Sequence, residues 1–299
     1  MAEILYGKPV ADALADETSL RVDTLRAAGV DPCLLIVRVG DDPGDLSYER
    51  SATRRCESIG IAVRTLCFEP DVSGDELVCA VREAGSDASV HGILILRPLP
   101  AHIDDRAVRE ALPAEKDIDG ITDGSLSGVY AGNGTGYAPC TAEACVRILE
   151  HYGIPIEGAH AVVAGRSLVI GRPAAMLLLH RHATVTICHS RTADLAGHCS
   201  QADILIAASG SREALTASCY RAGQVVLDVG IHVDPEGRVF GDVDYGTAER
   251  LVGAITPVPG GVGAVTTAVL ADHVVRAAEF TSQADRNCRS LESGREKSL

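Results

Sequence analysis

Residues 160–173 read His-Ala-Val-Val-Ala-Gly-Arg-Ser-Leu-Val-Ile-Gly-Arg-Pro, an apolar run that passes through a glycine turn into a second apolar, helical pattern. A strand, a glycine turn and a helix in this order place the pyrophosphate of a dinucleotide at the helix N-terminus. The stretch departs from the usual G-x-G-x-x-G spacing, because Ser167 takes the second position and Gly171 comes late. On its own it is therefore weak evidence, and the rest of the chain has to strengthen it.

Short runs rich in valine, isoleucine and leucine alternate with helical patterns along the rest of the chain. This alternation is typical of βαβ units that build a parallel sheet. The predicted strands are 33–39, 61–67, 90–96, 160–164, 184–188, 203–207 and 224–229. The predicted helices are 8–28, 44–58, 73–84, 104–111, 141–152 and 264–280.

This organisation predicts an α/β protein of two domains with a cleft between them. We expect an N-terminal α/β domain at 1–138, with the helix at 264–280 packing back onto it, and a Rossmann-like, doubly wound parallel sheet at 139–263. Residues 120–139 are rich in glycine, serine, aspartate and asparagine and show little periodicity, which predicts a connection between domains. Residues 281–299 are polar and are expected to form a flexible tail.

Composition excludes several classes of function. The 299-residue chain has a net charge of -14, which argues against binding to nucleic acid or to an anionic membrane. Its ten cysteines show no zinc-like spacing, so we expect no metal site and a reducing compartment. The N-terminus lacks a signal-peptide pattern and no apolar run is long enough to span a bilayer, which predicts a cytoplasmic protein.

The turn after the strand at 184–188 carries polar donors where a dinucleotide fold meets the adenosine ribose. An acidic residue at this point favours a free 2′-hydroxyl, and the sequence has none. Arg166, Ser190 and Arg191 offer guanidinium and hydroxyl donors instead, which match a 2′-phosphate. The same arginines could be solvated loop residues. The pattern favours NADP over NAD.

Two more predicted strand ends and one later loop are built for close approach of a ligand. Ser209-Gly210 and Gly230-Ile231 follow strands, and the carboxyl ends of parallel strands are where open α/β sheets bind ligands. Residues 255–267 read Ile-Thr-Pro-Val-Pro-Gly-Gly-Val-Gly-Ala-Val-Thr-Thr, a stiff loop with few side chains that leads into a helix. Such a loop suits a flat ligand held against backbone N–H groups, although a structural crossover would have the same composition.

The ordered motifs of the chain resemble the methylenetetrahydrofolate dehydrogenase/cyclohydrolase family from residue 5 to residue 280. The motifs are Val39-Gly40-Asp41-Asp42-Pro43 with Tyr48, Gly92-Ile93-Leu94-Ile95 before Pro98-Leu99-Pro100, Lys116-Asp117-Ile118-Asp119-Gly120, Pro139-Cys140-Thr141, Gly165-Arg166-Ser167 through Pro173, Asp228-Val229-Gly230-Ile231, Gly241-Asp242-Val243-Asp244 and the loop from Thr256 to Gly263. The resemblance implies folate binding in the N-terminal half, NADP binding in the C-terminal half and a homodimer. It also implies interconversion of 5,10-methylene- and 5,10-methenyl-tetrahydrofolate, usually with hydrolysis of the methenyl form.

The resemblance carries roles to individual residues. Tyr48 and Asp119 are implied as catalytic, although Tyr48 could be a packed helix residue and Asp119 could fix the turn at Gly120. The implied substrate-binding residues are Tyr48, Leu96, Pro98, Leu99, Asp119, Pro259, Gly260 and Gly261. The implied cofactor-binding residues are Thr141, Gly165, Arg166, Ser167, His189, Ser190, Arg191, Ser209, Gly210, Gly230 and Ile231.

Two positions depart from the family pattern in a way that affects one chemical step. Family members carry a lysine four residues after the tyrosine and a glutamine two residues before Pro-Leu-Pro, and this chain has Ala52 and Leu96 there. Adding water to the methenyl carbon needs a titratable group, and neither side chain has one. Arg55 could share the helix face, but a guanidinium stays protonated and is a poor base.

Three interpretations stay open at this stage. The first is an NADP-dependent dehydrogenase whose cyclohydrolase activity is absent or vestigial. The second is a family-derived NADP oxidoreductase with an altered substrate in specialised metabolism. The third is a non-catalytic relative that binds a nucleotide or a partner, which the retained Gly165-Arg166-Ser167 turn and Ser190 disfavour.

Overall fold

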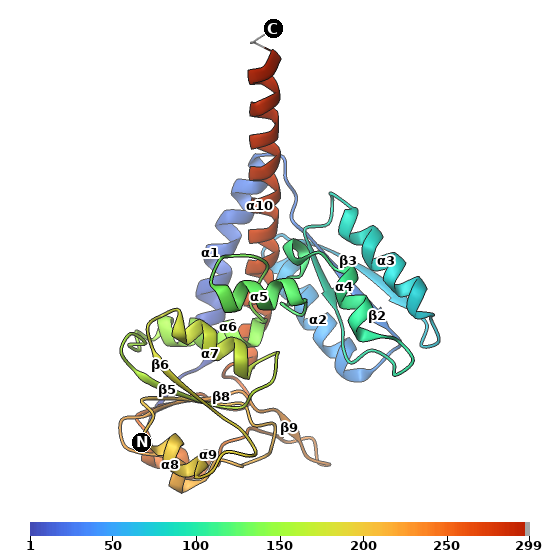
Figure 1. Ribbon diagram of the computed structural model, residues 1–299. Coiled ribbons are helices and arrows are strands. Elements are labelled where there is room, and N and C mark those ends of the chain that lie inside the picture. The colour runs from blue at the N-terminus through green and yellow to red at the C-terminus, as the bar shows by residue number, and fades with distance from the viewer. Residues whose placement is uncertain (297–299) are drawn as a thin grey trace. The chain divides into compact units, whose positions relative to one another are not determined.

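The computed structural model describes the backbone of residues 1–296 and the side chains of residues 1–283 (Figure 1). The chain divides into two compact units. Unit 1 contains Met1–Ala13 and Leu126–Val269, and unit 2 contains Leu14–Ser125 and the residues from Leu270 onward. Each unit has its own parallel sheet.

Unit 1 is built on a six-stranded sheet in the order β1-β11-β8-β7-β5-β6, in which every neighbouring pair is parallel. The strands are β1 (Glu3–Ile4), β5 (His160–Ala164), β6 (Thr184–Cys188), β7 (Ile204–Ala207), β8 (Val225–Asp228) and β11 (Ala254–Ile255). The central strands are short apolar runs because helices cover both of their faces. A separate antiparallel pair, β9 (His232–Val233) and β10 (Val239–Phe240), follows β8.

Helices flank this sheet on both faces, α7 on one and α8 and α9 on the other (Figure 1). The helices wholly within unit 1 are α6 (Cys140–His151), α7 (Gly171–Leu179), α8 (Leu195–Ser200), α9 (Tyr245–Leu251) and the short 3₁₀ turn η2 (Ala217–Cys219). Asp194 and Asp244 cap α8 and α9, because each carboxylate accepts a backbone N–H of the first turn. The arrangement is the doubly wound α/β fold that the sequence predicts.

Unit 2 contains a three-stranded parallel sheet in the order β3-β2-β4. Its strands are β2 (Cys33–Val39), β3 (Ala62–Phe68) and β4 (Gly92–Ile95), and its own helices are α2 (Pro43–Ser58), α3 (Gly74–Ser86), α4 (Asp105–Ala111) and the 3₁₀ turn η1 (Ala114–Lys116). Arg38 on β2 donates to Glu49 on α2 at 2.9 Å, which ties the helix to the central strand. This contact helps to fix the helix that carries Tyr48.

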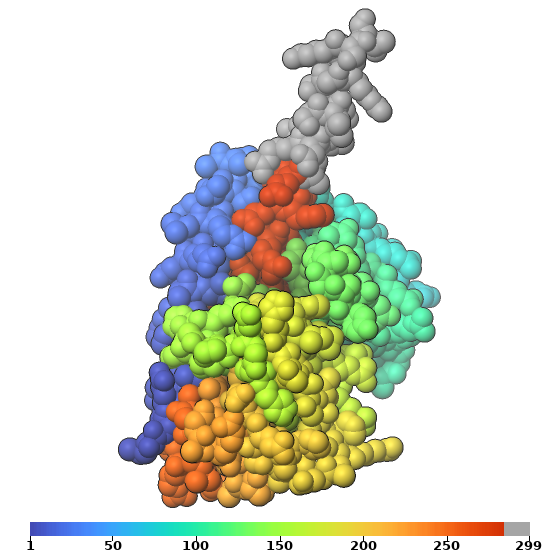
Figure 2. All heavy atoms as spheres, turned by 60° about the vertical axis from the view of Figure 1, so that its left-hand side comes forward, coloured from blue at the N-terminus to red at the C-terminus, as the bar shows by residue number. Residues whose placement is uncertain are grey.

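Two long helices, α1 (Gly7–Ala27) and α10 (Gly263–Glu296), each begin in unit 1 and continue into unit 2. Their parts in unit 2 lie side by side (Figure 2). Arg21 of α1 donates to both carboxylate oxygens of Glu279, at 2.9 and 2.7 Å. Such a two-point contact holds the helices in register more firmly than a single surface ion pair does.

The two-domain α/β class and the parallel, Rossmann-like sheet are confirmed, and two predicted segments differ. The helix α5 (Asp123–Ala131) lies within the segment that the sequence predicted to be an irregular connection. The last helix continues to Glu296, because no proline interrupts it, where a flexible tail was expected from residue 281. Residues 297–299 lie outside the described residues.

The contents of the units also differ from the predicted domain boundary. The sequence assigned residues 1–138 to one domain, whereas residues 1–13 and 126–138 belong to unit 1. The reason at the N-terminus is local, since Glu3 and Ile4 pair with Ala254 and Ile255 in the unit 1 sheet. As a functional boundary, the division between 138 and 139 stays a prediction.

Candidate dinucleotide and folate sites

The turn after β5 is tightly packed, because its two glycines lie against the backbone of neighbouring residues. A Cβ on Gly165 would lie 2.0 Å from the carbonyl oxygen of Ala208, and one on Gly171 would lie 2.3 Å from that of Gly165. Both positions therefore exclude any side chain. The hydroxyl of Ser167 accepts the N–H of Ile170 at 3.1 Å, so it organises the entry to α7. The turn and α7 together form the strand, glycine turn and helix that the sequence predicts.

The turn after β6 presents the polar groups that the sequence assigns to the 2′-phosphate. The N–H of His189 donates to the hydroxyl of Thr192 at 2.8 Å, and the N–H of Arg191 donates to His189 Nδ1 at 3.1 Å. Ser190 and Arg191 are exposed, as is Arg166 after β5. Within the described residues, neither guanidinium lies at ion-pair distance from a carboxylate. Thr141 lies in the first turn of α6 and is half-buried.

Two buried aspartates hold the turns that follow β7 and β8. Asp228 Oδ1 accepts the N–H groups of Gly230 and Asp242, both at 3.0 Å, and its Oδ2 accepts that of Val243 at 3.1 Å. Asp242 Oδ2 accepts the Ser209 hydroxyl at 3.0 Å and the Gly210 N–H at 2.9 Å. Thus three predicted cofactor positions, Ser209, Gly210 and Gly230, belong to one hydrogen-bonded arrangement, and Ile231 directly follows it. No role was predicted for the two aspartates, although Asp242 follows Gly241 and Asp228 lies two residues before Gly230 in the family motifs.

Close packing around the two carboxylates explains the neighbouring glycines. A Cβ on Gly241 would lie 1.8 Å from Asp228 Oδ2, and one on Gly230 would lie 2.3 Å from Asp242 Oδ1. Burial raises the pKa of Asp228 to about 6, against the effect of its three N–H donors. The Thr256 hydroxyl accepts the N–H of Asp228 at 2.8 Å and so connects this arrangement to the proline- and glycine-rich loop.

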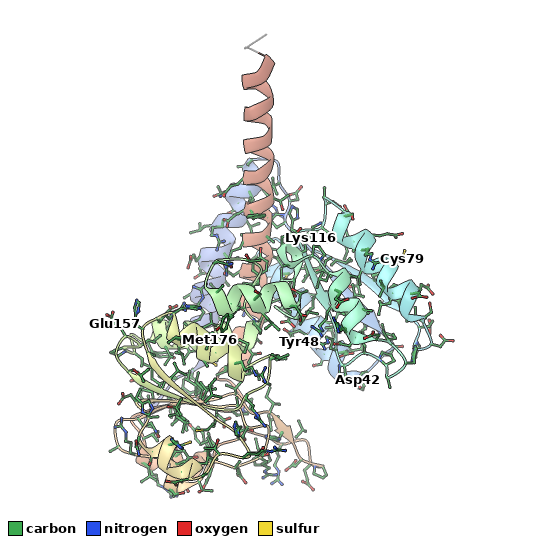
Figure 3. All side chains as sticks on the ribbon, in the orientation of Figure 1. Asp42, Tyr48, Cys79, Lys116, Glu157 and Met176 are labelled. Atoms are coloured by element: carbon green, nitrogen blue, oxygen red, sulfur yellow. The ribbon has the colours of Figure 1, made fainter. Side chains whose placement is uncertain are left out.

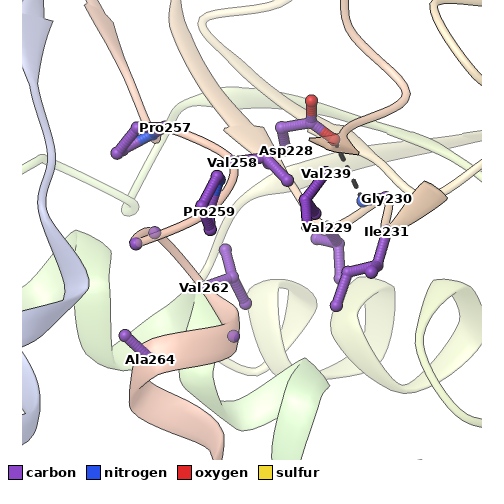
Figure 4. A pocket seen from close by; sticks show the side chains of 13 residues that line it. Asp228, Val229, Gly230, Ile231, Val239, Pro257, Val258, Pro259, Val262 and Ala264 are labelled. Atoms are coloured by element: carbon purple, nitrogen blue, oxygen red, sulfur yellow. Dashed lines mark hydrogen bonds between the residues drawn. The ribbon is translucent and has the colours of Figure 1, made fainter. Parts of the chain in front are cut away.

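A cavity of about 320 Å³ opens beside these turns within unit 1 (Figure 4). Its lining joins Asp228, Gly230 and Ile231 to the loop residues Pro257–Ala264. Figure 4 shows Pro259 and Val262 on one side and Val229 and Ile231 on the other. The structure therefore brings the predicted residues Pro259, Gly260 and Gly261 to the same cavity as the predicted cofactor residues Gly230 and Ile231. Its volume is within the range of about 300–1,000 Å³ typical of small-molecule sites.

In unit 2, α2 carries Tyr48, which is labelled in Figure 3, and Ala52 follows one turn later. The helix begins at Pro43 because the side chain of Asp42 accepts the N–H groups of Gly44 and Asp45. Tyr48 is half-buried, and Ala52 is fully buried at 0% exposed. Residues four apart share a helix face, so the position implied for a lysine is a buried methyl group on the face of the tyrosine.

The segment after β4 supplies the other implied folate residues. Leu96 is 5% exposed, Pro98 is exposed and Leu99 is half-buried. Asp119 is half-buried in the turn after η1. The residue that fixes this turn is Asp117, whose carboxylate accepts the N–H groups of Ile121 and Thr122 at 3.0 and 2.8 Å. Burial raises the pKa of Asp117.

Among the described residues, no group of three or more histidine, cysteine, aspartate or glutamate side chains is placed to hold a metal ion. No helix in the same part of the chain is both long enough and apolar enough to cross a lipid bilayer.

Glycine turns at successive strand ends, exposed guanidinium groups and an adjoining cavity define a Rossmann-like dinucleotide-binding protein of the α/β class. Comparison with known families extends this assignment. Residues 5–119 match the catalytic domain of tetrahydrofolate dehydrogenase/cyclohydrolase, and residues 139–282 match its NAD(P)-binding domain. The chain belongs to the tetrahydrofolate dehydrogenase/cyclohydrolase family, as its motifs predict.

Individual relatives match this chain over almost their whole length. The "Bifunctional protein FolD" of Carboxydothermus hydrogenoformans is 50% identical over 282 residues, which cover 94% of this chain and 98% of the relative. A FolD crystal structure from Campylobacter jejuni has a TM-score of 0.91 at 35% identity, covering 94% of this chain and 99% of its own. The Trypanosoma brucei enzyme, solved with NADP cofactor and inhibitor, has a TM-score of 0.88 at 30% identity, with 94% and 98% covered.

Proposed function

We propose that this protein is an NADP-dependent 5,10-methylenetetrahydrofolate dehydrogenase whose cyclohydrolase activity is lost or vestigial. The observation that carries the proposal is the pairing of Ala52 and Leu96, both buried and apolar, with a retained Tyr48 and Asp119. Dehydrogenase activity is a property of the family, and the loss of hydrolysis is the finer claim about this chain.

The residues of unit 1 fit a bound NADP. A Cβ at Gly165 or Gly171 would meet backbone within 2.3 Å, so the two glycines let the turn after β5 pack tightly at the start of α7. In a dinucleotide fold the pyrophosphate binds at this position. Arg166, Ser190 and Arg191 are exposed and offer charged and hydroxyl donors to a 2′-phosphate, which supports NADP over NAD. Ser209, Gly210, Gly230 and Ile231 follow β7 and β8 and take the rest of the dinucleotide.

Hydride transfer places modest demands on the protein side chains. A bound NADP would supply the hydride acceptor for the methylene carbon of the folate. Asp119 accepts hydrogen bonds from the amino and ring N–H groups of the pterin and so fixes its orientation. Tyr48 offers a ring face for stacking. Orientation alone can contribute about 7–11 kcal/mol to a reaction between two bound molecules, and no proton has to move in this step.

Hydrolysis of the methenyl product demands more. Water adds to the methenyl carbon and protons pass through ring opening, which requires a group that both gains and loses a proton near pH 7. The buried side chains at positions 52 and 96 are methyl and isobutyl groups. Arg55 on the same helix is half-buried, and a guanidinium is a poor general base. A general acid–base group typically contributes about 10²–10⁴-fold in rate, so its absence supports a single activity.

A spectrophotometric assay tests both halves of the proposal. Purified protein with 5,10-methylenetetrahydrofolate and NADP should form NADPH together with the methenyl absorbance. That absorbance should then decay at the rate measured without protein. The dehydrogenase assignment fails if neither NADP nor NAD is reduced, and the single-activity claim fails if the protein accelerates methenyl decay.

The altered-substrate alternative rests on the same two apolar positions, since loss of polar groups at the folate site also fits a new substrate. A protein that binds NADP but neither binds nor converts folate would favour the altered-substrate alternative. The homodimer and the cytoplasmic location stay predictions, as does the absence of nucleic-acid and membrane partners. Sedimentation equilibrium of the purified protein tests the homodimer.

A further inference from the structure

A carboxylate–imidazole pair lies beside the turns assigned to the cofactor. Asp242 Oδ1 lies 2.7 Å from His232 Nε2. The Asp242 side chain is fully buried, whereas that of His232 is 24% exposed. The carboxylate of Asp242 acts only as a hydrogen-bond acceptor, because its other neighbours are N–H and O–H donors. His232 Nε2 therefore carries the hydrogen and donates it. The contact therefore fixes both the tautomer and the orientation of the imidazole ring.

Asp242 is the point where three separate segments meet. Its second oxygen accepts the Ser209 hydroxyl and the Gly210 N–H after β7, and its own backbone N–H donates to Asp228 at the end of β8. His232 begins β9 directly after Ile231, which is 66% exposed and lines the cavity. Removing the imidazole donor would leave a buried carboxylate oxygen without that partner and would hold His232 only through the pairing of β9 with β10.

The strand order locates the part of the dinucleotide that this pair can affect. The order β8-β7-β5-β6 puts β6 on one side of β5 and puts β7 and β8 on the other. The pyrophosphate belongs at the turn after β5, and the adenosine ribose belongs at the end of β6. The ends of β7 and β8 therefore face the nicotinamide half.

We propose that Asp242 and His232 are positioning residues that hold the Ser209–Gly210 and Gly230–Ile231 turns for the nicotinamide half of NADP. This inference rests on the proposed function, because it presumes that unit 1 binds the dinucleotide. The pair acts through the turns and transfers no proton in the reaction.

The test compares two ligands by calorimetric titration. NADPH spans both halves of the site, whereas adenosine 2′,5′-bisphosphate reaches only the adenosine half. His232→Phe removes the donor and keeps a ring, and His232→Ala removes it without adding bulk. His232→Gln keeps an N–H close to the position of Nε2. Asp244→Asn is the matched control, since Asp244 caps α9 in the same segment and touches none of these turns.

The phenylalanine and alanine variants should weaken NADPH binding by about tenfold and leave the bisphosphate Kd within about twofold of the parent value. The glutamine variant should recover most of the NADPH affinity, and the Asp244 variant should match the parent. Unchanged NADPH affinity in both donor-free variants overturns the proposal, and so does an equal loss for both ligands, which would indicate general loosening of the fold. A parent protein that binds no NADPH would instead defeat the proposed function itself.

Discussion

The turns of unit 1 and the Tyr48 face of α2 in unit 2 differ in how their residues are held. Hydrogen bonds connect the residues of the turns, whereas Ala52 on α2 has no polar side chain. In unit 1, polar groups at the strand ends are fixed by buried carboxylates, and each hydrogen bond of Asp228 and Asp242 depends on another. On α2, the residue one turn after Tyr48 is the small, buried Ala52. A network of interdependent hydrogen bonds loses stability when any member changes, whereas an isolated position on a helix face can change alone.

The contrast explains how one activity can be lost while another remains. Hydride transfer depends on orientation, which many residues share. Methenyl hydrolysis depends on one titratable group, which a single substitution removes. The proposed loss of cyclohydrolase activity is thus a change at two positions, 52 and 96, with the remaining implied site residues in place.

The largest effect is expected from restoring the missing groups. The double change Ala52→Lys, Leu96→Gln should create methenyl hydrolysis about 10²-fold or more above the parent, because burial lowers the pKa of an ammonium toward the range of a general base. The decay of methenyl absorbance measures it. Ser51→Lys adds the same charge at an exposed position of α2 and should create none. A folded double variant that keeps its dehydrogenase activity without hydrolysis would show that other parts of the site have changed too.

The next effect concerns the folate contact that remains. Asp119→Asn should lower kcat/KM for 5,10-methylenetetrahydrofolate by about 10- to 100-fold, since hydrogen bonds to a charged acceptor contribute about 1.5–3 kcal/mol. Steady-state kinetics at saturating NADP measures the change. Glu115→Gln, an exposed neutralisation in the preceding turn, is the control. Equal kinetics for the Asp119 and Glu115 variants would remove Asp119 from the site.

A smaller effect should separate the two cofactors. Arg166→Gln or Arg191→Gln should raise the KM for NADP by about tenfold and change the KM for NAD little, because only NADP carries the 2′-phosphate. The control is Arg250→Gln, which removes an exposed cation on α9. Parallel increases for NADP and NAD would place the arginines on a group that the two cofactors share.

The smallest effect is on stability and has a defined pH window. The pKa of Asp228 is about 6 in the folded protein, above its ordinary value of 3.8. The folded state therefore binds the proton more tightly than the unfolded state does. Its contribution to stability is fully present below pH 3.8 and is lost as the pH rises through 6. Urea unfolding should show that the parent loses more stability between pH 4 and pH 7 than Asp228→Asn does. Parallel pH profiles for the two proteins would contradict the assigned pKa.

Most strands and helices could be predicted from apolar runs alone. The strands at 33–39 and 160–164 match β2 and β5 at both ends, because each is a continuous buried run. The helix α5 could not be predicted, because tertiary contacts stabilise it. Thr122 accepts the N–H of Ser125 at its start, and His180 Nε2 contacts the carbonyl of Val129 at 2.8 Å. His180 is far from α5 along the chain, whereas Thr122 directly precedes the helix and is a local capping residue.

The place of the predicted cofactor residues in the fold could be predicted from the sequence, whereas the residues that support them could not, and contact with the cofactor stays a prediction. Strand ends and glycine turns identify Gly165, Ser209 and Gly230 from the sequence, since their position along the chain determines their place in a parallel sheet. Asp242 and His232 act through a pairing between segments that no local pattern encodes. The paired Asp and Gly motifs were the available signal, because a buried carboxylate needs a neighbour without a side chain.

The glycine beside Asp228 also bears on how this protein can change over time. At Gly241 even a methyl group would occupy the space of the carboxylate oxygens, so alanine, the mildest replacement, is sterically barred. A saturation library at position 241 should return almost nothing but the parent codon, whereas one at position 52 should return many small and medium residues. The packing therefore leaves position 52 on α2 far more open to substitution than position 241 beside Asp228.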